Sequence, residues 1–161
     1  MLDKKGMQLG LGGIAKGWAL DRAKNELKQR GFRCFLLTGG GQVLVGGTKN
    51  GEPWRVGIRD PRGTPNDYFA VLEPGEGSVS TSGDYERFFM SDGPRYHHIL
   101  DPKTGMPSTG LRSATTVSQD ATLADAMSTA LMVLGARRGL ILAEETKGLE
   151  AVLVDSSGQV F

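Results

Sequence analysis

Two side chains with hard oxygen donors stand four residues apart in a strongly apolar stretch of this sequence. The stretch runs from Asp120 to Gly135 and contains Asp125 and Thr129. Its apolar residues recur at helical spacing, which predicts a helix that ends at Gly135. Residues four apart lie one turn above each other on a helix, so the carboxylate and the hydroxyl would face one place. Such a pair suits Mg2+, which adds water and phosphate oxygens to one or two carboxylates.

A purely structural interpretation fits the same helix. An acidic residue near its beginning is stabilised by the helix dipole, and a threonine can hydrogen-bond back to its own backbone. The helix by itself does not distinguish this interpretation from a metal site.

A second segment that could bind a ligand is GLGGIAKG at residues 10–17. It leads into a predicted helix of about sixteen residues that ends at Gly31. A glycine-rich helix entry attracts phosphate because its backbone N–H groups are free, and Lys16 adds a positive charge. The Walker pattern fails, because Ala15 and Gly17 replace its second glycine and its Ser/Thr. A nicotinamide-binding Rossmann fold is excluded, because the next predicted strand ends without the ribose-binding acid. The alternative is a tight helix entry with Lys16 in solvent.

Both histidines of the chain are adjacent, in RYHHILDPKTG at residues 95–105. On a strand, His97 and His98 would face opposite ways, so one could face a site while the other faces solvent or the core. Histidine suits proton transfer near neutral pH, although a structural role is the alternative. The residues Asp101–Gly105 have the composition of a turn.

Composition limits the class of protein. A chain of 161 residues fits one domain, and a net charge of +1 with dispersed charges gives no sign of nucleic-acid binding. Cys34 is the single cysteine and lies in an apolar run, so we expect a buried thiol and no disulfide. No apolar run approaches the length of a membrane span, and the first residues do not resemble a signal peptide. The compartment cannot be read from the sequence directly.

The remaining pattern predicts short strands joined by turns. We expect hairpins at the glycines Gly39–Gly41 and at Ser91–Pro94, and a helix at Arg137–Thr146. Neighbouring strands with short connections favour antiparallel pairing, which predicts an α+β fold with one mainly antiparallel sheet and helices on one face. The expected strands are Met7–Leu11, Phe32–Leu37, Gln42–Val45, Trp54–Ile58, Tyr68–Leu72, Ser78–Ser82, Tyr85–Met90, Arg95–Leu100, Arg112–Val117, Ala151–Val154 and Gln159–Phe161.

The segments occur in an order that resembles the ApbE family, the FAD:protein FMN transferases. The resemblance is carried by LGGIAKGWALDRA, GGGQVLVGG, PWRVGIRDP, VSTSGDYERFF, RYHHILDPKTG and DATLADAMSTALMVLG, and it spans about Leu9 to Phe161. It implies a fold related to the tunnelling fold, dependence on Mg2+, and FAD as the donor. The implied reaction transfers FMN to a Thr or Ser hydroxyl of a partner protein and releases AMP. The implied partners are flavin-bearing subunits of Na+-translocating or Rnf-type electron-transport complexes.

The resemblance also assigns residues. It implies that Asp125, Thr129 and the backbone carbonyl of Ala15 bind the metal, and that His98 takes part in catalysis. It places Lys16 near the FAD pyrophosphate. Further FAD contacts are expected at His98 and in two glycine turns, at Gly40, Gly41, Thr104 and Gly105.

Two departures from the family pattern leave alternatives open. Thr38-Gly39-Gly40-Gly41-Gln42 stands where the family often has Asn-x-Gly-Gly-Asp. Family members are usually about twice this size, so we expect one ApbE-like domain over residues 1–161 that lacks the usual N-terminal portion with its flavin contacts and export signal. The alternatives are a Mg2+-dependent FAD pyrophosphatase that gives FMN and AMP, and a non-catalytic flavin-binding or oligomerisation module. The resemblance suggests a bacterial cell envelope setting, and the sequence does not indicate the acceptor or the oligomeric state.

Overall fold

A five-stranded antiparallel sheet forms the centre of the computed structural model, which describes residues 4–161. Every pair of neighbouring strands is antiparallel, which confirms the predicted pairing and the α+β class. The spatial order is β1 (Phe35–Gly39), β2 (Gln42–Gly46), β5 (Gly77–Gly83), β8 (Leu111–Ser118) and β9 (Leu149–Asp155).

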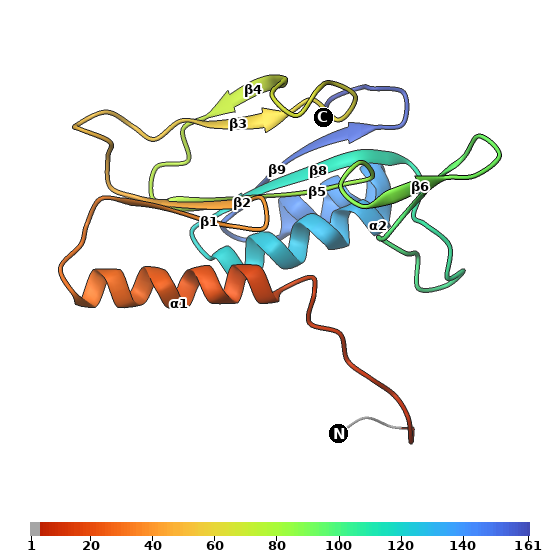
Figure 1. The fold of residues 1–161 in the computed structure, drawn as a ribbon, viewed down its shortest axis with the longest axis horizontal. Helices are drawn as coiled ribbons and strands as arrows, with labels where there is room; N and C mark the ends of the chain where they lie inside the picture. Colours follow the sequence, from red (N-terminus) through yellow and green to blue (C-terminus); the bar gives the residue numbers. More distant parts are fainter. Residues whose placement is uncertain (1–3) are drawn as a thin grey trace.

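Two helices cover one face of this sheet (Figure 1). Helix α1 (Ala15–Gln29) packs through Leu20 against Phe35 and Leu44, and helix α2 (Ala121–Glu145) packs against β5, β8 and β9. Gly135 has φ of 75° and divides α2 into two helical parts. Glycine tolerates this left-handed conformation, which confirms the predicted helix end there and the predicted second helix after it.

By length and composition alone, helix α2 is long and apolar enough to cross a membrane, a test that a core helix also passes. In the structure α2 contributes Leu131 and Met132 to the core, where both are fully buried. These contacts give the apolar side of α2 a packing role against the sheet.

Two small hairpins complete the fold as separate two-stranded sheets, so the prediction that all strands belong to one sheet was wrong. Strands β3 (Val56–Arg59) and β4 (Tyr68–Leu72) lie on the sheet face opposite the helices (Figure 1). Val56 and Ile58 alternate as buried residues of β3, which explains why this hairpin packs as a separate layer. Strands β6 (Phe88–Met90) and β7 (Arg95–His97) form a separate pair beyond β5.

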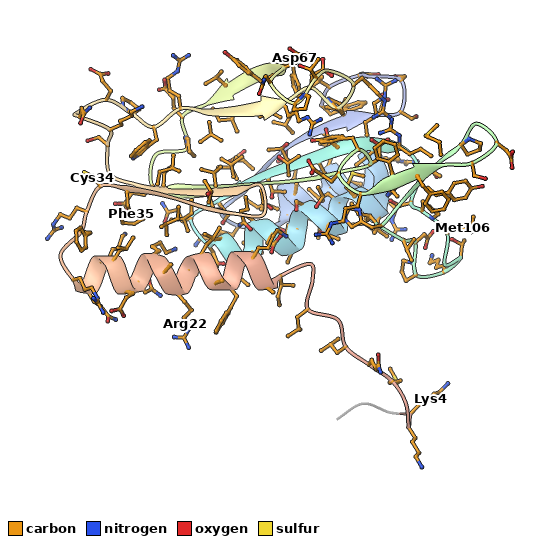
Figure 2. All side chains as sticks on the ribbon, in the orientation of Figure 1. Lys4, Arg22, Cys34, Phe35, Asp67 and Met106 are labelled. Carbon is orange, nitrogen blue, oxygen red and sulfur yellow. The ribbon has the colours of Figure 1, made fainter. Side chains whose placement is uncertain are left out.

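Three local predictions met different outcomes. Residues 7–11 are exposed and form no strand, and this segment leads away from the start of α1 (Figure 1). Cys34 is exposed and not a core thiol, because β1 begins one residue later and the burial alternation starts at Phe35 (both residues are labelled in Figure 2). The predicted last hairpin is confirmed, because Val160 pairs with Val154.

Candidate active site

Helices α1 and α2 cross at a contact that only glycine permits. A Cβ atom on Gly17 would lie 2.1 Å from the carbonyl oxygen of Ala121, far inside contact distance. Asp21, one turn further along α1, accepts hydrogen bonds from the backbone N–H groups of Ala121 and Thr122, at 3.1 and 2.8 Å. The start of α2 is therefore held directly against α1, and residues beside the crossing meet.

The crossing brings Lys16 and Asp125 together. Lys16 Nζ lies 2.6 Å from Oδ1 of Asp125, and the backbone N–H of Gly17 donates to Oδ2 at 3.0 Å. The Asp125 side chain is 1% exposed while that of Lys16 is 37% exposed, so the ammonium lies between a buried carboxylate and solvent. The interpretation of Lys16 as merely solvated was wrong.

The predicted glycine turn lies beneath the Lys16 side chain. Gly40 and Gly41 have φ of 54° and 87° and link β1 to β2 as a two-residue turn. A Cβ on Gly40 would lie 2.8 Å from Cδ of Lys16, so glycine lets the lysine stem pass close to the backbone. Gly40 thus belongs to the Lys16 and Asp125 cluster by contact.

Thr129 lies one turn after Asp125, and its hydroxyl points away from its own backbone. Its Oγ1 is 3.2 Å from Oγ of Ser82 on β5, and Ser82 is also 2.9 Å from Oγ of Ser128. The Ser128 hydroxyl lies 3.0 Å from the backbone oxygen of Asp125. The interpretation of Thr129 as a backbone-bonded residue was wrong, and a row of hydroxyls instead fixes its orientation.

The oxygen atoms gathered here have the chemistry of a Mg2+ site. Asp125 supplies a carboxylate, Thr129 a hydroxyl, and Ala15 begins α1 beside Lys16. A Cβ on Gly13 would lie 3.7 Å from Oγ1 of Thr129, so the glycine-rich entry to α1 adjoins this hydroxyl. Residues 4–161 hold no group of three or more His, Cys, Asp or Glu side chains that could bind a metal ion. The donors present fit a hard cation that completes its shell with water and phosphate.

The two histidines have different surroundings, as predicted, but the strand predicted to hold both, Arg95–Leu100, ends at His97. His97 is buried and both its ring nitrogens are engaged, Nε2 with the Ser108 carbonyl at 3.0 Å and Nδ1 with the N–H of Ile99 at 3.3 Å. His98 is exposed, and its Nδ1 lies 3.3 Å from the carbonyl oxygen of Arg87. A carbonyl only accepts, so in the neutral imidazole this contact assigns the proton to Nδ1 of His98 and leaves Nε2 as an acceptor.

A hollow of about 520 Å³ opens beside His98. Gly105 lines it from the turn at residues 101–105, where its φ is +70° and its N–H donates to the Asp101 carbonyl at 2.8 Å. The Thr104 hydroxyl accepts from the N–H of Met106 at 3.2 Å, which confirms the predicted turn. Figure 2 shows Met106 at this end of the molecule. Aromatic and apolar side chains form other walls, namely Phe89, Tyr96, Leu100 and Met106.

The structure thus gathers the predicted residues into two groups. Lys16, Gly40, Asp125 and Thr129 form one group, and His98 and Gly105 line the other, with Thr104 in the adjoining turn. Sequence reasoning did not assign Ser82 to Thr129, because the two are 47 positions apart and no local pattern joins them. It also left Gln42 unexplained. The Gln42 amide donates to Ser78 Oγ and to the Ala121 carbonyl, which ties the sheet to the helix crossing.

Comparison with known sequences identifies the family. The chain matches the ApbE family over residues 1–153. This protein belongs to the ApbE family. The ApbE chain is 40% identical to the FAD:protein FMN transferase of Treponema pallidum (strain Nichols), over 95% of its own length and 45% of the relative. It is 42% identical to the FAD:protein FMN transferase of Rhodobacter capsulatus, over 96% of its own length and 29% of the relative.

Solved structures give the same result for the fold. The crystal structure of the ApbE protein of Thermotoga maritima MSB8 superposes with a TM-score of 0.87 at 43% identity, over 98% of this chain and 52% of that one. The flavin transferase ApbE of Vibrio cholerae superposes with a TM-score of 0.81 at 32% identity, over 95% of this chain and 49% of that one. The ApbE chain therefore spans about half the length of these structures and less than half of the two curated relatives.

Proposed function

We propose that this ApbE chain carries the phosphoryl-transfer site of a Mg2+-dependent FAD:protein FMN transferase. The reaction moves FMN from FAD to a Thr or Ser hydroxyl of a target flavoprotein and releases AMP. The acceptors we propose are flavin-bearing subunits of Na+-translocating or Rnf-type redox complexes. Support comes from relatives named FAD:protein FMN transferase that match almost the whole of this chain.

The observation that carries the proposal is the contact between Lys16 and Asp125. A buried carboxylate and a half-exposed ammonium meet at a glycine-rich helix entry, with the Thr129 hydroxyl one turn away. The positive end of the α1 dipole and the Lys16 charge would attract the pyrophosphate of FAD. The oxygens of Asp125, Thr129 and Ala15 would hold Mg2+ next to it. When bound, Mg2+ would neutralise charge on the phosphates and assist departure of AMP.

In this site the residues act chiefly by position and charge. Lys16 would move from Asp125 to the pyrophosphate once a cation takes its place, since one carboxylate oxygen now serves the ammonium. The Thr129 hydroxyl would donate its hydrogen bond to Oγ of Ser82, which leaves a Thr129 lone pair for the cation. The buried Asp125 would keep its orientation through the Gly17 N–H.

His98 would accept the proton that the attacking hydroxyl loses. The acceptor hydroxyl attacks the phosphorus on the FMN side of the FAD pyrophosphate, and the bond from that phosphorus to the AMP oxygen breaks. The hydroxyl proton passes to Nε2 of His98, which is free because Nδ1 faces the Arg87 carbonyl. AMP leaves with the bridging oxygen. No covalent intermediate with the protein is needed.

The proposal is tested by incubating the chain with FAD, Mg2+ and a purified flavin-acceptor subunit of an Rnf-type complex. We expect flavin fluorescence on the acceptor in a denaturing gel, an acceptor mass raised by one FMN, and loss of both signals with EDTA. Lys28→Met is a matched control, because Lys28 pairs with Glu76 in an exposed ion pair away from this site.

The same experiment distinguishes the two alternatives. Free FMN and AMP without labelled acceptor would identify a FAD pyrophosphatase, in which water replaces the acceptor hydroxyl. Unchanged FAD would contradict catalysis by this chain and favour a flavin-binding or oligomerisation module.

A further inference from the structure

A nearly buried carboxylate, Asp84, lies between the two groups of the candidate site and belongs to neither. It follows β5 two residues after Ser82, and it is 8% exposed. Arg62 holds it with two hydrogen bonds, Nη1 to Oδ1 at 2.7 Å and Nη2 to Oδ2 at 2.6 Å. This bidentate geometry gives a carboxylate and guanidinium pair its greatest strength and directional definition.

Asp84 is fixed to the body of the fold. Its backbone N–H donates to the carbonyl of Arg112 on β8 at 2.9 Å, and Arg62 belongs to the loop between β3 and β4. The Asp84 hydrogen bonds raise the pKa of Arg62 above its ordinary value. Asp84 is therefore held both to the central sheet and to the β3–β4 hairpin.

A second cation links Asp84 to the β6–β7 hairpin. Arg95 Nη1 lies 3.5 Å from Oδ1 of Asp84 and 3.5 Å from its carbonyl oxygen. The Arg95 guanidinium also lies 4.0 Å from the ring centre of Phe88, the residue that pairs with His97 across the hairpin. Arg95 thus holds both strands of the hairpin and connects them to Asp84.

The position of His98 depends on this hairpin. His98 follows β7 directly, and its backbone N–H donates to the Arg87 carbonyl next to β6 at 3.2 Å. On the other side of Asp84, Ser82 contacts Thr129. Asp84 thus follows Ser82, which contacts Thr129, by two residues, and it contacts Arg95, which precedes His98 by three residues.

We propose that Asp84 and Arg95 form a positioning pair that holds the β6–β7 hairpin, and with it His98, at a fixed distance from Asp125 and Thr129. This rests on the proposed function for its catalytic consequence. The pair does not touch substrate. It orients the proton acceptor relative to the phosphates, and phosphoryl transfer depends strongly on such alignment.

The decisive variant is Arg95→Met, which keeps an apolar stem over Phe88 and removes the charge. Removal of Asp84 itself would leave Arg62 without its partner and endanger folding, so the arginine is the better target. We expect turnover to fall about 10-fold, while the KM for FAD and the affinity for Mg2+ each change less than about 2-fold. Arg95→Lys retains the charge and should restore turnover to within about 3-fold of the original chain.

A second measurement does not depend on activity. Amide hydrogen exchange in residues 86–98 should become faster in Arg95→Met, while exchange in α1 stays unchanged. Arg59→Met is the matched control. Arg59 lies over the Tyr85 ring at 4.7 Å and near Glu86 at 3.7 Å. It therefore contacts the segment between β5 and β6 without contacting Asp84 or Phe88. It should change neither turnover nor exchange in residues 88–98, because its own partners, Tyr85 and Glu86, precede that range.

The outcomes separate this proposal from the proposed function. If the unaltered chain transfers no FMN, the transferase assignment fails, and hydrogen exchange alone then decides whether the pair holds the hairpin. Unchanged exchange in Arg95→Met overturns the proposal. Faster exchange with unchanged turnover in an active chain overturns it as well, because the hairpin would then not position His98.

Discussion

Lys16 and Asp125 are separated by 109 positions in the sequence, yet Lys16 Nζ lies 2.6 Å from Asp125 Oδ1. The ammonium occupies the side of a buried carboxylate on which a cation would bind. Lys16 and Mg2+ would therefore compete for the same oxygen. Competition between a tethered ammonium and a free cation gives a test of the metal site that needs no flavin.

Replacing Lys16 with methionine should strengthen Mg2+ binding in the absence of FAD. Without its partner, the buried Asp125 carboxylate destabilises the fold until a cation compensates its charge. We expect added Mg2+ to raise the Tm of Lys16→Met more than that of the original chain, because a ligand stabilises the state it binds. Lys28→Met serves as the control. An equal or smaller Mg2+ shift in Lys16→Met would contradict the assignment of Asp125.

Asp125→Asn should remove the metal effect while keeping the shape of the side chain. The asparagine can still accept the Gly17 hydrogen bond, so we expect a loss of about 1–3 kcal/mol in the free energy of unfolding. The Tm should no longer respond to Mg2+, and metal-dependent turnover should disappear. Retained Mg2+-dependent turnover would show that the metal binds elsewhere.

Variants of the two histidines should affect different properties, turnover for His98 and thermal stability for His97. His98→Ala should lower turnover about 100-fold with little change in FAD affinity, because His98 is exposed and supplies only the proton acceptor. His97→Ala should instead lower the Tm, since it breaks the bonds to Ser108 and Ile99 in a buried place. Calorimetric FAD binding and thermal unfolding of both variants give the comparison. An equal loss of FAD binding in His98→Ala would make that residue a binding contact.

The sequence was sufficient for features that depend on neighbouring residues. Helical spacing placed Asp125 and Thr129 on one turn, and the glycine rules located the break at Gly135 and the turn at Gly40–Gly41. The predicted difference between His97 and His98 also holds, although only His97 lies on β7. The helical and glycine features follow from the local geometry of the backbone.

Features that depend on the end of an element or on distant residues were not accessible. Cys34 lies one residue before β1, so its apolar neighbours did not bury it. The apolar residues of 7–11 form no strand because no partner strand adjoins them among residues 4–161. The Ser82 contact with Thr129 joins β5 to α2, and the Gln42 contact with Ala121 spans 79 positions. Only the packing of α2 on the sheet creates such pairs.

The contact of Asp21 with the start of α2 predicts a dependence of stability on pH. Burial would raise the pKa of Asp21, but hydrogen bonds from Lys24, Thr122 and Ala121 outweigh burial and lower the pKa below its ordinary 3.8. A carboxyl with a lowered folded-state pKa stabilises the fold above its unfolded pKa, and this stability is lost as the pH falls through the folded value.

Asp21→Asn should therefore cost about 1 kcal/mol near neutral pH and much less in strong acid. Urea unfolding between pH 7 and pH 2 measures the difference. The two stability curves should converge below about pH 4, where the Asp21 carboxylate takes up its proton. Curves that remain parallel throughout would show that the charge of Asp21 does not hold α1 to α2.

The last prediction concerns the helix crossing that brings Lys16 to Asp125. In Gly17→Ala, the new Cβ would lie 2.1 Å from the Ala121 carbonyl oxygen, so the helices must separate. We expect a loss of about 1–3 kcal/mol in the free energy of unfolding. Mg2+ binding should also weaken, because the first turns of α1 and α2 move apart. Gly12→Ala is the matched control, since no atom lies within 4 Å of a Cβ there. Urea unfolding and Mg2+ titration of both variants test this. If Gly17→Ala matches Gly12→Ala in stability and Mg2+ affinity, the close crossing does not set the geometry of the site.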